Sequence, residues 1–67
     1  MMVDARRYAR RLTLEDAISV WLQRWAGEFQ HTIAARFAVN PGRVNDVLKG
    51  RLHPESRSLA LSRRAAA

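Results

Sequence analysis

Between residues 14 and 26, apolar side chains recur every three or four positions. At 100° per residue they occupy an arc of about 140°, and Asp16 and Gln23 lie opposite. Thr13 is a favourable N-cap with an acid three positions later, and Gly27 is a typical helix stop. The pattern predicts a helix over residues 14–26. Its expected inward residues are Leu14, Ala17, Ile18, Trp21, Leu22 and Trp25.

Two shorter helices are predicted after it, over residues 29–37 and 41–49, with a three-residue connection between them. Asn40 is a strong N-cap, and Pro41 suits the first turn because an N–H would have no partner there. Gly50 marks the end of the third helix. The expected inward residues of these two helices are Ile33, Ala34, Phe37, Val44, Val47 and Leu48.

The two ends of the chain have weaker patterns. Residues 1–12 form a basic arm, for which a short helix over 5–11 and a flexible segment are both compatible with the sequence. Residues 51–67 form a tail in which Pro54 begins a short last helix, and the final residues are expected to fray. The expected fold is a single all-α domain with a core of three helices.

Composition limits the class of protein. Hydrophobic residues make up 48% of the 67 residues, which supplies a core that a disordered polycation lacks. The longest stretches without a charge are seven residues, too short for a membrane span. There is no cysteine for a disulfide or a thiolate site. No secretory signal pattern is present, so we expect a cytoplasmic protein.

Charge indicates the kind of partner. Twelve Lys and Arg residues against six Asp and Glu residues give a formal net charge of +6. Such an excess favours a polyanion, either a nucleic acid or an anionic membrane surface. A chain this short buries only about 60% of its extended surface. We therefore also expect it to associate with a second copy or another partner.

Residues 30–49, QHTIAARFAVNPGRVNDVLK, resemble the helix-turn-helix motif of short regulators from bacteria, phages and mobile elements. The likeness lies in Gln30, Ile33, Ala34, Phe37, Val39, Val44, Val47 and Leu48. Ala38 stands where such families usually have glycine, at a cost of about 1 kcal/mol if its φ is positive. The resemblance implies a tri-helical helix-turn-helix core that binds double-stranded DNA and regulates transcription, most simply as a repressor or autoregulator. Such a protein would lie on the bacterial nucleoid when bound.

On a helical wheel, Gly42, Asp46 and Lys49 face away from the core, with Arg43 and Asn45 on the flanks. The resemblance implies that this face enters the major groove, where Arg43 suits guanine, Asn45 adenine and Asp46 cytosine. Asp46 equally suits an ion pair with Arg43 or Lys49 within the helix. Expected base contacts are Pro41, Gly42, Arg43, Asn45 and Asp46. Expected DNA-backbone contacts are Gln30, Thr32, Arg36, Asn40, Lys49 and Arg51. The arginines of the arm, Arg6, Arg7, Arg10 and Arg11, either contact DNA or form a solvated face.

One monomer would contact only about 3–5 base pairs, so the resemblance further implies a homodimer on an inverted repeat. The candidate dimer surface consists of Tyr8, Leu12, Leu52, Leu59 and Leu61. Two alternatives remain: a protein-binding regulator of the antiactivator kind and a basic RNA-binding protein. RNA binding is disfavoured because single-strand binders expose aromatic side chains. Here Trp21, Trp25, Phe29 and Phe37 are all expected in the core.

Nothing in the sequence indicates catalysis. It has no glycine-rich phosphate loop, no nucleophile elbow and no inward-facing pair of carboxylates. His31 and His53 are isolated, without acidic residues at metal-ligand spacing. We therefore expect no catalytic residue, no metal, no cofactor and no small-molecule ligand.

Overall fold

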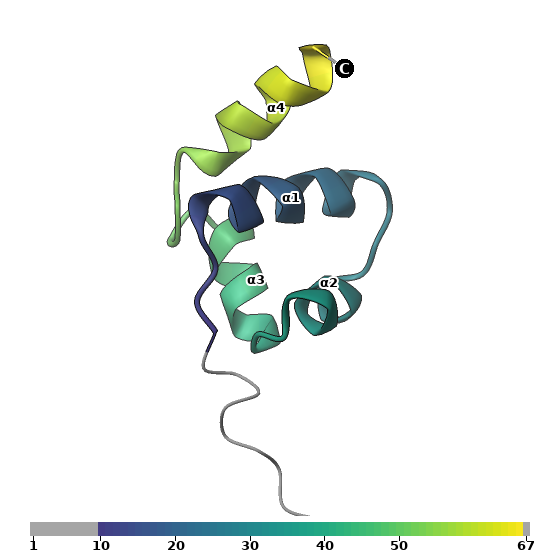
Figure 1. Cartoon of the computed structure of the whole chain (residues 1–67), viewed down its shortest axis with the longest axis vertical. Coiled ribbons are helices and arrows are strands. Elements are labelled where there is room, and N and C mark those ends of the chain that lie inside the picture. Colours follow the sequence, from purple (N-terminus) through teal and green to yellow (C-terminus); the bar gives the residue numbers. More distant parts are fainter. Residues whose placement is uncertain (1–9, 67) are drawn as a thin grey trace, which may run out of the picture.

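The computed structural model describes residues 10–66, which form helices and no strand (Figure 1). The helices are α1 (Leu14–Trp25), α2 (Gln30–Phe37), α3 (Pro41–Leu48) and α4 (Ser56–Ala66). The expected all-α class is confirmed for these residues. Helix α1 is central, with α2 and α3 packed on one side and α4 on the other. The first three helices begin and end within one residue of the bounds expected from the sequence.

Helix α1 starts at a complete capping box. The Thr13 hydroxyl accepts a hydrogen bond from the backbone N–H of Asp16 at 3.1 Å, and the Asp16 carboxylate accepts one from the backbone N–H of Thr13 at 3.0 Å. These bonds satisfy two donors that a helix start otherwise leaves unpaired. At the other end, Gly27 has a φ of 98° and turns the chain toward α2.

The core lies between α1, α2 and α3. Its buried residues are Leu12, Ala17, Val20, Ile33, Ala34, Val39, Val44 and Val47, with Trp21, Phe37, Leu48 and Leu52 packed against them. Val20 falls outside the apolar arc expected for α1 and is nevertheless fully buried. The reason is that α1 is covered on two sides, so its buried surface is wider than a single stripe.

The connection between α2 and α3 turns at Ala38, whose φ of 54° and ψ of 44° place it in the left-handed region. The next residue, Val39, is buried, and its N–H donates to the Ala34 carbonyl at 3.1 Å. Asn40 then caps α3, because its side-chain oxygen accepts from the Gly42 N–H at 2.8 Å. Ala38 thus adopts the conformation that usually favours glycine.

Helix α4 begins two residues after Pro54, so the expected last helix is present. It runs to Ala66, so the expectation that the final residues fray is wrong within the described part of the chain. It packs along α1 and buries Ser56 and Ala60. The Trp21 indole N–H donates to the buried Ser56 hydroxyl at 2.9 Å. The guanidinium carbons of Arg57 and Arg64 lie 5.9 and 5.4 Å from the ring centres of Trp21 and Trp25. Polar and cation–π contacts therefore add to the packing of Ala60, in a segment whose apolar pattern is weak in the sequence.

Three further expectations need correction. Residues 10–13 are not helical, and residues 1–9 of the arm, with Arg6, Arg7 and Tyr8, lie outside the described part. Leu12 is 5% exposed and belongs to the core, so it is not available to a dimer surface. Phe29 precedes α2 and is 67% exposed, and its ring is stacked on that of His31 with 5.7 Å between the ring centres.

Within residues 10–66, no helix is long and apolar enough to cross a membrane.

Candidate functional site

Helix α3 turns one side toward the core and the other toward solvent. Val44 and Val47 are fully buried, whereas Arg43 and Lys49 are exposed and Asn45 is half-buried. This separation follows from helical spacing, because the polar residues alternate with the two inward valines. The outward side carries the residues expected to contact bases: Pro41, Gly42, Arg43, Asn45 and Asp46.

Asp46 forms ion pairs with two arginines. Its carboxylate lies 3.0 Å from the Arg43 guanidinium, one helical turn away, and 3.4 Å from that of Arg51. Its backbone carbonyl also accepts from the Arg51 N–H at 2.9 Å. Of the two roles suggested by the sequence, the ion pair with Arg43 is formed, whereas the second partner is Arg51 rather than Lys49. Gly50 folds the chain back beyond α3, so helical spacing alone could not indicate this contact.

These ion pairs are at the surface and can be exchanged for other partners. The Arg43 and Arg51 side chains are 58% and 66% exposed, and that of Asp46 is 22% exposed. Exposed pairs of this kind contribute about 0–1 kcal/mol. An acceptor that takes over either guanidinium group must displace its contact with Asp46, so the two pairs together impose a modest restraint on the two arginines.

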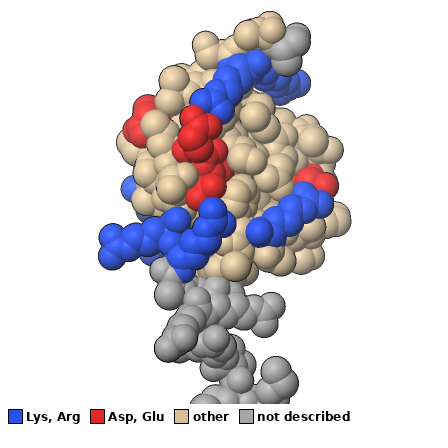
Figure 2. All heavy atoms as spheres, in the orientation of Figure 1, with Lys and Arg blue, Asp and Glu red and all other residues tan. Residues whose placement is uncertain are grey.

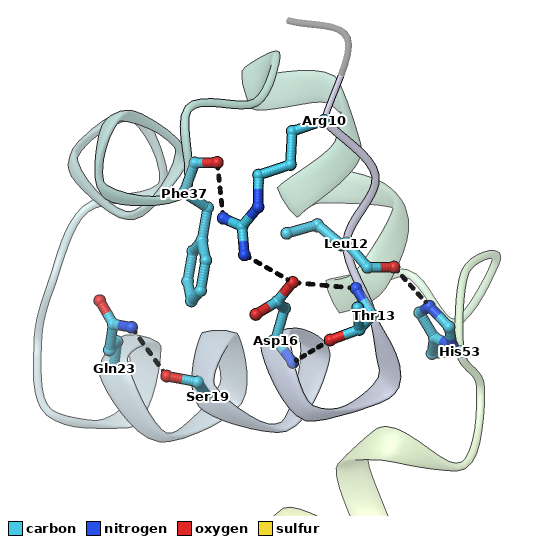
Figure 3. Close-up of polar contacts among 8 residues, drawn as sticks. All are labelled: Arg10, Leu12, Thr13, Asp16, Ser19, Gln23, Phe37 and His53. Atoms are coloured by element: carbon cyan, nitrogen blue, oxygen red, sulfur yellow. Dashed lines mark hydrogen bonds and ion pairs between the residues drawn. The ribbon is translucent and has the colours of Figure 1, made fainter.

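Two of the arginines expected to contact DNA bind the protein itself. Arg36 donates to Gln23 at 2.9 Å and to Glu28 at 3.1 Å, which ties α2 to the end of α1. Arg10 donates to the Phe37 carbonyl at 2.8 Å and to Asp16 at 3.0 Å (Figure 3). Its guanidinium also lies 5.4 Å from the centre of the Phe37 ring. Both arginines therefore have a structural role that the sequence did not indicate.

Asn40, expected to contact the DNA backbone, uses its side-chain oxygen to cap α3. Arg51, another expected backbone contact, is paired with Asp46. Within residues 10–66, no side-chain hydrogen bond holds Gln30, Thr32 or Lys49 in this way. Gln30 and Thr32 are half-buried on α2, and Lys49 is exposed after α3. Arg11, the remaining arginine of the arm in the described part, is also exposed.

Residues 10–13 are held in place beside the site. The His53 ring nitrogen Nε2 lies 2.8 Å from the Leu12 carbonyl, so it must carry the hydrogen and donate it (Figure 3). Together with the buried Leu12 side chain and the Arg10 contacts, this bond fixes the path of the chain. Since Arg10 binds the last residue of α2, the arm meets the folded part next to the α2–α3 connection (Figure 1).

Basic and acidic side chains lie in separate groups on the face of the molecule drawn in Figure 2. Figure 2 shows basic side chains at the end where the arm joins and along α4, with acidic ones between them. On α4, Arg63 binds Glu15 of α1 through two hydrogen bonds of 2.6 and 2.5 Å, which lower the pKa of Glu15 below its usual value. Around α3, by contrast, three cationic side chains oppose one carboxylate. They are Arg43, Lys49 and Arg51 against Asp46.

The solvent-facing side of α3 offers hydrogen-bond donors and positive charge. Within residues 10–66, no group of three or more His, Cys, Asp or Glu side chains could hold a metal ion. No protein-family model, curated protein or solved structure matches this chain.

Proposed function

We propose that this chain binds double-stranded DNA in a sequence-specific manner and regulates transcription, with α3 as the helix that enters the major groove. The arrangement of α2 and α3 carries the proposal. Two eight-residue helices are joined through the left-handed Ala38 and the buried Val39, and the second is capped by Asn40. Two short helices joined by so tight a turn favour a helix-turn-helix motif, and the polar side of α3 is accessible to a ligand.

Dimensions and chemistry support the same proposal. An α-helix with its side chains is about 10–12 Å across, close to the major-groove width of about 12 Å. Arg43 can donate two hydrogen bonds to guanine, and Asn45 can pair with adenine. Lys49, Arg11, Gln30 and Thr32 are the proposed backbone contacts, whereas Arg10 and Arg36 are assigned to holding the fold. The overall charge of +6 supplies attraction to phosphates.

A monomer with one short recognition helix contacts too few base pairs for a genomic site, so we propose a homodimer on an inverted repeat. Of the leucines first considered for the interface, Leu12 is buried and Leu52 packs against the core. Leu59 and Leu61 on α4 remain, at 39% and 40% exposure. Bound dimers would regulate by blocking access of RNA polymerase to the promoter.

The test is selection from a random duplex library followed by fluorescence anisotropy across salt concentrations. We expect an enriched site that binds about 10³-fold more tightly than a scrambled duplex. The Arg43→Ala, Asn45→Ala double variant should lose this preference, because each bidentate base contact contributes about 1–3 kcal/mol. Arg24→Ala with Ser62→Ala removes the same charge on other helices and should retain it. Equal binding of the wild-type chain to all duplexes would refute the proposal. If the double variant still regulates transcription, the regulation acts through a protein partner.

The exposed stack of Phe29 on His31 favours one second candidate, a basic protein that binds single-stranded RNA. Aromatic side chains that stack on bases contribute about 1–3 kcal/mol per base, and Phe29 is accessible for such a contact. Under this alternative, Phe29→Ala weakens binding to a labelled single-stranded RNA at least about tenfold. Under the DNA proposal, the same variant leaves binding to the selected duplex unchanged.

A further inference from the structure

Asp46 is the one acidic residue of α3, and it lies on the side that the proposed function directs toward DNA. A carboxylate there opposes the phosphates, so it requires a physical reason. The structure provides one, because the Asp46 carboxylate bridges Arg43 within α3 and Arg51 beyond its end, at 3.0 and 3.4 Å. One negative charge thus holds two guanidinium groups, one on α3 and one just beyond its end.

We infer that Asp46 is a specificity-determining residue that positions Arg43 for base contacts and restrains both Arg43 and Arg51 from binding phosphates indiscriminately. This inference rests on the proposed function. Each guanidinium has five N–H donors, so the bridge to Asp46 leaves others available for a guanine edge. An arginine without such a restraint is flexible and binds the nearest phosphate, which adds affinity but no sequence information.

The negative charge of Asp46 also favours the matching DNA sequence over others, as the restraint of the arginines does. At a wrong site, the Asp46 carboxylate repels the DNA backbone, and no base contact compensates for that repulsion. At the right site, hydrogen bonds from the restrained arginines offset it. Asp46 therefore lowers affinity for all DNA and lowers it least for the matching sequence, which is how a repulsive element improves discrimination.

The experiment compares the full chain with its Asp46→Asn variant on the selected duplex and on a scrambled duplex, at several salt concentrations. We expect the variant to bind the scrambled duplex about tenfold more tightly, with a salt slope about one to two units steeper, because one or two arginines are released to phosphates. The ratio of the two affinities should fall about tenfold. Asp46→Ala is measured alongside, since asparagine can itself contact adenine.

Glu15→Gln is the matched control. It removes the same charge and also releases an arginine, because Glu15 pairs with Arg63, but on α1 and α4 instead of α3. We expect it to leave the ratio of the two affinities unchanged. In an Arg43→Gln, Arg51→Gln background, Asp46→Asn should also lose its effect on the ratio, which a purely structural role would not predict.

Circular dichroism establishes that each variant is folded. A wild-type chain that selects a site, together with Asp46→Asn and Asp46→Ala variants whose affinity ratio is unchanged, overturns the inference and leaves the proposed function intact. A wild-type chain that enriches no duplex overturns both. An equal loss of the ratio in Glu15→Gln also overturns the inference, because net charge would then explain the effect.

Discussion

Replacing Ala38 with glycine should stabilise the fold. Ala38 has a φ of 54° and is exposed, so its methyl group strains the backbone and contributes little packing. An alanine in the left-handed region costs about 1–2 kcal/mol relative to the right-handed one. Glycine adds about 0.4–1 kcal/mol of conformational entropy to the unfolded chain. The difference predicts a gain of about 0.5–1 kcal/mol for Ala38→Gly.

The measurement is reversible unfolding by urea and by heat, followed by circular dichroism and by the fluorescence of Trp21 and Trp25. For a domain of this size, the expected gain raises Tm by about 2–8 °C. Both probes should report the same midpoint, because a small domain of this kind unfolds in one step. The slope of the urea transition should stay unchanged, since the variant exposes no new surface.

Ala35→Gly provides a control with the same chemical change three residues earlier. Ala35 is also exposed but lies within α2, so glycine there should destabilise the fold by about 0.5–1 kcal/mol. The two variants must therefore shift the midpoint in opposite directions. A loss of stability in Ala38→Gly similar to that in Ala35→Gly would refute the left-handed conformation at Ala38 and the tight connection built on it.

Three further results are expected. Ser56→Ala should lower the free energy of unfolding by about 1–3 kcal/mol, because it leaves the Trp21 N–H without its partner, and a Trp21→Phe background should remove most of that loss in a double-mutant cycle. Since its hydrogen bond with Arg63 lowers the pKa of Glu15, the pair stabilises the fold above the usual carboxyl pKa. This stabilisation disappears as the pH falls through the lowered pKa, so urea midpoints of the wild type and Glu15→Gln should converge at acid pH. Leu59→Arg should shift the mass measured by light scattering from dimer to monomer and leave the helical content unchanged.

Local signals along the chain were sufficient for α1, α2 and α3. The capping box at Thr13, the Asn40 cap and the apolar spacing of α3 depend on neighbours in sequence, so they can be recognised without a structure. The extent of α4 could not be predicted in the same way. It is held by the Trp21–Ser56 hydrogen bond and by arginines lying over tryptophan rings, across separations that leave no periodic signal.

The candidate site shows the same division. The outward orientation of Arg43 and Asp46 follows from the helical wheel, and the pair between them was one of two roles that spacing suggested. The internal contacts of Arg10 and Arg36 depend on chain segments brought together by folding, so these residues looked like free surface cations in the sequence. Phe29 was expected in the core because its side chain is apolar. It is exposed because it precedes the first turn of α2.

Residues at the start of α1 and just before it bind residues near the other end of the described chain, and these contacts affect folding during synthesis on the ribosome. The Leu12 carbonyl finds its donor in His53, 41 residues later, and Glu15 finds its partner in Arg63, 48 residues later. Until those residues emerge, a nascent chain has α1 with one side uncovered and Trp21 without the Ser56 hydroxyl. Because such distant contacts form late, the complete fold can be reached only when nearly all of these 67 residues have left the exit tunnel.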